Sequence, residues 1–180
     1  IKADEQIEYE DFGAGNPSEM NREDIVKKLL KSGLWTTVRQ RPYHVIANPE
    51  EKPKSIFVST FDTAPLAPDL NFILKAEKEN FQTGINVLKK LTEGKVHLNI
   101  KSTNDTESIF NQIQGVDTNT FKGPHPSGNV GIQIHHLDPI NRNESVWYVQ
   151  PQHLVMIGKL FNEGKFDAAK TIALTGSEIK

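Results

Sequence analysis

The chain has 180 residues, a net charge of −2 and 36% hydrophobic residues, which is typical of one globular domain with its own core. The charge is too balanced for the basic surface of a nucleic-acid-binding protein, and no apolar run reaches the ~18 residues of a membrane-spanning helix. Cysteine is absent, which excludes disulfides, thiolate-ligated zinc or iron–sulfur clusters, and thiol nucleophiles within this chain.

The first predicted helix follows an acidic leading segment, residues 1–17. Ser18 and Asn21 are both good N-cap residues, and apolar side chains then recur at the i, i+4 spacing of one helical face. Gly33 follows as a residue that favours the helix C-terminus. We therefore expect a helix that begins near Ser18 or Asn21 and ends before Gly33.

Residues 34–43 are rich in large side chains and are expected to be extended. Residues 55–61 are short, apolar and β-branched, which predicts a buried strand that ends in a loop at 62–69. A long helix, interrupted near its start, is predicted for 71–93, and residues 96–100 alternate as a strand does.

The second half of the chain continues this alternation. A weak helix is predicted for 104–113 and a strand for 116–121. After a Gly/Pro/His-rich stretch we expect a short strand at 146–149, a helix at about 151–163 and a last strand at 171–174.

Strands that alternate with helices predict right-handed βαβ units, and hence an α/β fold with a mostly parallel sheet and helices on its faces. In such sheets, ligands bind outside the carboxyl ends of the strands. Two predicted loops lie at that edge, residues 62–69 and residues 122–139.

The stretch 122–139 concentrates glycine, proline and histidine. Glycine can adopt positive φ, and proline fixes φ while favouring extended geometry in the residue before it. We predict a structural role for six residues of the stretch: Gly123, Pro124, Pro126, Gly128, Asp138 and Pro139. The stretch is interpreted as a shaped loop and helix start that serves packing or docking rather than chemistry.

Nucleotide-binding and hydrolase motifs are missing from this sequence. The two phosphate-binding motifs, G-x-G-x-x-G and Walker A, do not occur, and neither does the G-x-S-x-G motif that carries a nucleophilic serine. The residues 128–131, Gly-Asn-Val-Gly, predict a tight turn that opens a helix. The alternative is an anion seat, because free backbone N–H groups gather at a helix N-terminus.

Histidines suggest a metal or acid–base cluster, since His125, His135, His136 and Asp138 are close in sequence. Adjacent side chains diverge by about 100° on a helix and about 180° on a strand, so His135 and His136 cannot both serve one small site. We expect one of them to face the core and the other a groove. No metal ligand and no catalytic residue is predicted.

Two arginines precede the first predicted strand. Arg39 and Arg41, with Trp35 and Tyr43, could form a cation–aromatic contact with an anion or a quinone. The alternative is a solvated, partly packed surface.

Taken together, these segments resemble the NqrA component of the bacterial Na⁺-translocating NADH:quinone oxidoreductase. The resemblance runs from about residue 18 to residue 176, and the Gly-Pro-His-Pro stretch is its most specific part. The matching segments are Ser32-Gly33-Leu34-Trp35, Arg41-Pro42-Tyr43, Asp62-Thr63 with Pro65-Leu66-Ala67, Leu91 to His97, Gly123-Pro124-His125-Pro126 with Gly128, His135 with Leu137-Asp138-Pro139, Val146-Trp147, and Ile157-Gly158 with Leu160-Phe161.

The resemblance implies a peripheral subunit on the cytoplasmic face of the bacterial inner membrane. It implies a respiratory pump that oxidises NADH, reduces ubiquinone and exports Na⁺, with the other Nqr subunits as partners, above all the membrane-embedded NqrB. FMN, FAD and iron–sulfur clusters are expected in those other subunits. This chain would be a central fragment, preceded by a barrel-sandwich domain and followed by a ubiquitin-like domain.

A more distant resemblance links the chain to the NADH- and FMN-binding subunit of respiratory complex I and to the RnfC component of the Rnf complex. In those relatives, a Ser-Gly-Leu start leads into a glycine-rich loop that holds the flavin. Here Ser32-Gly33-Leu34 leads into residues 35–41, which contain no glycine, so side chains would keep the backbone away from a phosphate. The resemblance implies a Rossmann-like domain at 18–168 without the flavin loop or a cofactor, and a segment 169–180 that carries the last strand.

Two functions follow as expectations. The first is a non-catalytic structural or assembly domain of NqrA. The alternative is a ligand-binding domain that contributes to a quinone or residual nucleotide site, with contact through Arg41, His125, His135 and His136.

Overall fold

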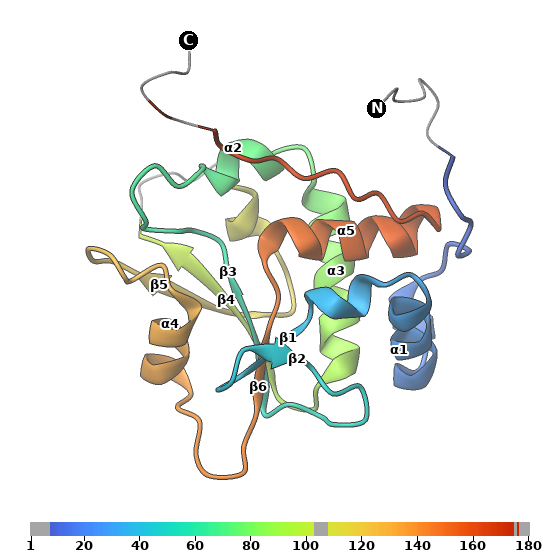
Figure 1. The fold of residues 1–180 in the computed structure, drawn as a ribbon, viewed down its shortest axis with the longest axis horizontal. Helices are drawn as coiled ribbons and strands as arrows, with labels where there is room; N and C mark the ends of the chain where they lie inside the picture. Colours follow the sequence, from blue (N-terminus) through green and yellow to red (C-terminus); the bar gives the residue numbers. More distant parts are fainter. Residues whose placement is uncertain (1–7, 103–107, 175, 177–180) are drawn as a thin grey trace.

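The computed structural model describes residues 8–102, 108–174 and 176. At its centre lies a six-stranded sheet in the order β2-β1-β6-β3-β4-β5 (Figure 1). The strands are β1 (Arg39–Arg41), β2 (Val45–Ile46), β3 (Ser55–Ser59), β4 (Lys95–Lys101), β5 (Asp117–Phe121) and β6 (Val146–Tyr148).

Four neighbouring strands are parallel. β3 pairs in parallel with β4 and β6, and β4 pairs in parallel with β5. β1 runs antiparallel to β6 and turns back into β2 as a hairpin at the edge of the sheet. The prediction of an α/β fold with a mostly parallel sheet is therefore confirmed.

Helices cover both faces of the sheet (Figure 1). α1 (Arg22–Lys31), α3 (Lys78–Leu91) and α5 (Pro151–Glu163) lie on one face, and α4 (Val130–Leu137) lies on the other. The shorter helices are η1 (Pro17–Glu19), η2 (Leu34–Thr37), α2 (Leu70–Leu74) and η3 (Ile109–Gln112). None of the helices in the described part of the chain is long and apolar enough to cross a membrane.

Most predicted helices are confirmed. α1 begins after the N-cap Asn21, whose side chain accepts a hydrogen bond from the Asp24 N–H, and the break in the long helix separates α2 from α3. The weak helix at 104–113 is reduced to η3, and its residues 104–107 lie outside the described residues. The segment 34–43, expected to be extended, begins instead with η2, because the Val38 N–H bonds to the Trp35 carbonyl.

The two core clusters follow from strand alternation, since successive side chains point to opposite faces. Ile56 and Val58 of β3 pack toward α1, α3 and α5, whereas Phe57 packs toward α4 with Ile134 and Tyr148. The central strand is thus buried on both sides, as the continuous apolar run at 55–61 predicts.

The predicted last strand at 171–174 is wrong. Residues 169–174, all of them described, form no strand and are exposed. The Gln152 side chain binds the Thr171 backbone on both sides, accepting from its N–H at 2.9 Å and donating to its carbonyl at 3.0 Å. These two groups of Thr171 are the ones that a strand would use for pairing, and the segment instead runs back along α5 as an irregular strap (Figure 1).

α3 and α5 approach each other closely through a glycine. A β-carbon at Gly158 of α5 would lie 1.8 Å from the carbonyl oxygen of Asn80 in α3. Because backbone atoms cannot yield as a flexible side chain can, any side chain here would push the helices apart.

We expect Gly158→Ala to lower the free energy of unfolding by at least about 1–3 kcal/mol, the range found for overpacked cores. Chemical denaturation measures the effect. Gly15→Ala is the matched control, because its β-carbon would meet only the Met20 sulfur, at an ordinary 3.6 Å. Equal stability of the two variants would contradict the close helix contact.

Candidate functional site: the crevice at the carboxyl edge of the sheet

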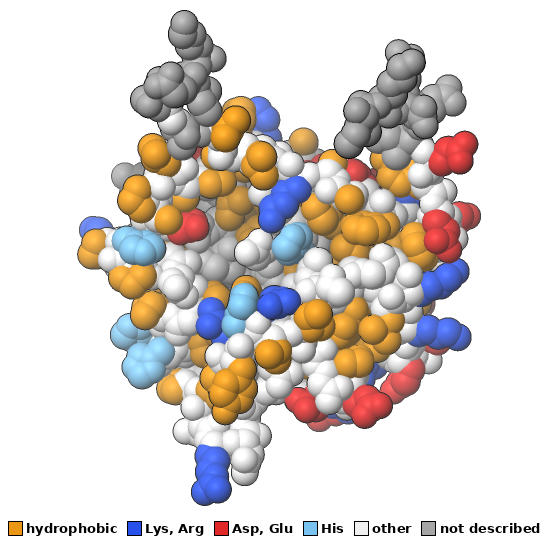
Figure 2. All heavy atoms as spheres, in the orientation of Figure 1, with side chains coloured by type: hydrophobic (Ala, Val, Ile, Leu, Met, Phe, Trp, Pro, Cys, Tyr) orange, Lys and Arg blue, Asp and Glu red, His pale blue; other side chains and the backbone are white. Residues whose placement is uncertain are grey.

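A crevice of about 600 Å³ opens at the carboxyl ends of β3 and β6. β4 and β5 lie on one side of β3, whereas β6, which the chain reaches through α4 on the other face of the sheet, lies on the opposite side of β3. The order in which strands are added therefore reverses at β3. Such a switch point is where open α/β sheets bind ligands. The face drawn in Figure 2 is hollowed near its middle, and Lys, Arg and His side chains lie around the hollow.

Five separate segments line the crevice. They are the end of β1, the loop after β3, the loop before α4, the end of β6 with the start of α5, and the strap at 170–173.

Gly128 brings two of these loops into contact. Its N–H donates to the Thr63 hydroxyl at 3.0 Å, and the same hydroxyl lies 3.1 Å from His125 Nδ1. A β-carbon at Gly128 would lie 2.6 Å from the Thr63 nitrogen. A glycine is therefore required at position 128 because a side chain would collide with the backbone of the loop after β3. Its φ angle is not positive, whereas that of Gly123 is.

A buried polar network fixes the start of α4 against the sheet. Gln133 is fully buried, and its amide nitrogen donates to Ser59 Oγ at 2.9 Å and to the Ser127 carbonyl at 3.1 Å. Its amide oxygen accepts from Asn99 at 2.8 Å, and Asn99 in turn accepts from Asn119. A buried polar group is stable only when it is paired in this way, so the network holds one arrangement of the loop.

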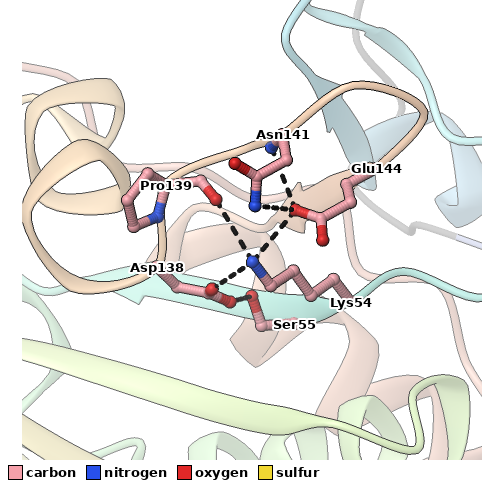
Figure 3. Close-up of polar contacts among 6 residues, drawn as sticks. All are labelled: Lys54, Ser55, Asp138, Pro139, Asn141 and Glu144. Carbon is pink, nitrogen blue, oxygen red and sulfur yellow. Dashed lines mark hydrogen bonds and ion pairs between the residues drawn. The ribbon is translucent and has the colours of Figure 1, made fainter.

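The other end of α4 is fixed at the opposite edge of the sheet (Figure 3). Lys54, just before β3, contacts Asp138 at 2.6 Å and Glu144 at 3.0 Å. Ser55 Oγ donates to the second oxygen of Asp138 at 2.6 Å, and Lys54 also donates to the Pro139 carbonyl. Asp138 and Pro139 thus join the C-terminal end of α4 to the residues at the start of β3.

Charge pairing shifts the pKa values in this cluster. Burial raises the pKa of Asp138, but hydrogen bonds from Lys54 and Ser55 outweigh it and hold that pKa below its usual value. The Asn141 backbone N–H, followed by Lys54, lowers the pKa of Glu144. Hydrogen bonds to Asp138 and Glu144 raise the pKa of Lys54. Lys54, Asp138 and Glu144 are therefore all charged at neutral pH.

Arg41 lines the crevice, and the described part of the chain offers it no hydrogen-bond acceptor. Its guanidinium carbon is 5.4 Å from the centre of the Tyr148 ring, and its Nε is buried away from solvent. The Tyr148 hydroxyl lies 2.8 Å from His44 Nδ1, and the two rings stack. Desolvation, followed by the charges of Arg39 and Arg41, lowers the pKa of His44, which favours neutral imidazole beside the guanidinium.

Comparison with known proteins decides the family. The family model for the NqrA second alpha/beta domain matches residues 20–166. The chain belongs to this family.

Similar proteins carry one shared name, which is that of the NqrA component of the Na(+)-translocating NADH-quinone reductase. The chain is 39% identical over 180 residues to that of Photorhabdus laumondii, 35% over 179 residues to that of Neisseria meningitidis and 34% over 180 residues to that of Glaesserella parasuis. Each alignment covers 99–100% of this chain and 40% of the relative. The chain thus spans about two fifths of the length of these relatives.

In this NqrA-family domain, two of the four predicted contact residues come together. Arg41 and His125 line the same crevice although they are far apart in sequence. His135 and His136 are both exposed on the last turn of α4 and do not line it. The expectation that one of them faces the core is wrong, because α4 packs on the sheet through Gln133 and Ile134.

Three residues that shape the site were not predicted as site residues. Two of them could have been found from the sequence, because Thr63 lies in the loop at the expected ligand edge and Gln133 is a polar residue within an apolar helix. Nothing in the sequence indicates Tyr148 as a site residue, because its position at the crevice depends on the order of the strands. No group of three or more His, Asp or Glu side chains in the described part of the chain could hold a metal ion.

We expect Asp138→Asn to lower the free energy of unfolding by about 1 kcal/mol at neutral pH, because it removes a partly exposed charge pair and weakens the bond from Ser55. The folded-state pKa of Asp138 is depressed. Its contribution is therefore complete above the unfolded-state pKa, about 4, and is lost as pH falls through the folded-state value.

Thermal unfolding from pH 3 to pH 8 measures this dependence. The gap between wild type and Asp138→Asn should be constant above about pH 5 and narrow below about pH 4. Glu50→Gln, at an exposed residue, should leave the curve unchanged. A gap that stayed constant down to pH 3 would argue against the ion pair.

Proposed function

We propose that this chain serves as a non-catalytic structural domain of NqrA in a Na⁺-translocating NADH-quinone reductase, and that it binds neither flavin nor NADH. Its partners would be the other subunits of that complex, above all the membrane-embedded NqrB, at the cytoplasmic face of the inner membrane. The curated relatives bear the name of this component, and the family match carries the proposal to this chain.

The packing of residues 34–41 carries the cofactor-free part of the proposal. Leu34, Trp35 and Val38 are buried, and Trp35 donates from its indole nitrogen to the Ala47 carbonyl at 2.7 Å. Residues 39–41 then pair with β6. A segment occupied by core side chains and strand pairing leaves no glycine-lined backbone surface for a phosphate, which supports the loss of the flavin loop.

Exposed apolar side chains support an assembly role. Tyr43, Val45 and Ile46 lie on the β1–β2 hairpin, and Tyr43 is 84% exposed. Leu66 and Ile172 are exposed at the crevice mouth. Apolar side chains that gather on a surface are typical of sites that other proteins cover.

Isothermal titration tests the cofactor-free part. The purified chain should be colourless and give no saturable heat with FMN or NADH up to millimolar concentration. Micromolar binding of either nucleotide at one site per chain would refute it.

A second candidate function is ligand binding at a quinone site. The specific observation in its favour is that the crevice is open and lined by Arg41 and His125. The imidazole or the guanidinium could donate a hydrogen bond to a quinone carbonyl oxygen.

Photo-crosslinking tests this candidate. A quinone analogue with a photoreactive group should label peptides around 59–70 and 122–131, and unlabelled ubiquinone should compete. Labelling confined to other segments of the chain would exclude a quinone in the crevice.

A further inference from the structure

The arginines of this chain differ in how their hydrogen-bonding capacity is used. Arg22 donates to the carbonyls of Pro49 and Glu51, and Arg39 donates to the carbonyl of His44. In the described part of the chain, the half-buried Arg41 has neither a hydrogen-bond acceptor nor a carboxylate partner. A guanidinium has five N–H donors in a fixed fork, and leaving buried donors unpaired is costly.

The guanidinium of Arg41 forms part of the wall of the crevice. Arg41 lines the crevice, and a β-carbon at Gly131 would lie 3.8 Å from one of its terminal nitrogens. It therefore lies beside the first turn of α4, where Val130 also lines the crevice. The partial positive charge of a helix N-terminus adds to that of the arginine.

Charges around the crevice favour an anion. Lys170 of the strap contributes a second cation to the lining, and Asp62 is the carboxylate among the described lining residues. Asp62 is exposed, and its Oδ1 accepts the Ala64 N–H at 2.8 Å within its own loop. Among the described residues, Asp62 forms no ion pair with Arg41.

Apolar side chains complete the lining. Leu66, Val130, Pro151 and Ile172 face the crevice from four different segments. A volume of about 600 Å³ lies within the range of small-molecule sites, ~300–1,000 Å³. A ligand that satisfied this lining would carry an acidic group on an apolar body.

We propose that the crevice binds an amphipathic small-molecule anion, with a carboxylate or phosphate held by Arg41 and an apolar body against Leu66, Val130 and Ile172. The planar guanidinium of Arg41 can form two parallel hydrogen bonds to a carboxylate or phosphate, which a lysine cannot. The proposal uses the same crevice as the second candidate function. It does not depend on the role of the chain in the reductase.

Titration of the purified chain at constant ionic strength tests the proposal, since the chain has buried cores on both faces of its sheet. The probes are hexyl phosphate and hexanoate, with hexanol as the neutral control. We expect saturable binding of at least one anion and none of hexanol. Absence of saturable binding for both anions, or equal binding of hexanol, would overturn the proposal.

Three variants assign the binding to the guanidinium. Arg41→Gln should weaken anion binding roughly tenfold to hundredfold, the effect of losing a charge-assisted pair. Arg41→Lys keeps the charge and the stem but loses the fork, so a smaller loss is expected and the fold is preserved. Arg39→Gln is the matched control, because Arg39 lies on the same strand with the same charge but does not line the crevice.

Unchanged affinity in both Arg41 variants would overturn the proposal, as would an equal loss in Arg39→Gln. The outcome is separable from the proposed function. Anion binding without FMN, NADH or quinone binding would support the crevice site and leave the structural role intact. FMN binding abolished by Arg41→Gln would refute the cofactor-free role while supporting the anion site.

Discussion

The attachment of α4 to β3 at both ends is the constraint on which the site depends. At the carboxyl end of the strand, Gln133 bonds to Ser59, and at the amino end, Lys54 and Ser55 bond to Asp138. A helix of eight residues has little stability of its own, so tertiary contacts must hold it. Because both ends are fixed, the loop before α4 can only lie against the loop after β3, and His125 is placed at the crevice.

The two attachments work by different physics. Gln133 is fully buried and uses neutral hydrogen bonds, whose strength depends on complete pairing inside the protein. Asp138 and Lys54 lie nearer solvent and rely on charge, so their contribution varies with pH. The bonds of Gln133 thus involve only neutral groups, whereas the contact between Lys54 and Asp138 joins two titratable ones.

The segment 34–41 contributes both to the core and to the crevice. Leu34, Trp35 and Val38 are buried in the core, and residues 39–41 pair with β6. The same strand pairing places Arg41 on the α4 face of the sheet, beside Tyr148. The segment therefore brings a cationic group to the edge where α/β sheets bind ligands.

By itself, the sequence determined the α/β class, the positions of α1, α3 and α5, and the buried strand β3. These features are local, because they follow from hydrophobic periodicity, capping residues and backbone restrictions. The predicted strand at 171–174 does not form, and the Gln152 side chain binds the backbone N–H and carbonyl of Thr171 instead.

Only the tertiary structure decided which residues form the site. Arg41 and Tyr148 come together because β1 and β6 are neighbours, and strand order is not encoded in any single segment. His125 joins them from the loop before α4. His135 and His136 were equal candidates in sequence, and their exclusion depends on which side of α4 packs on the sheet. That Arg41 has no acceptor among the described residues is equally a property of the folded chain, because it depends on which side chains surround the guanidinium.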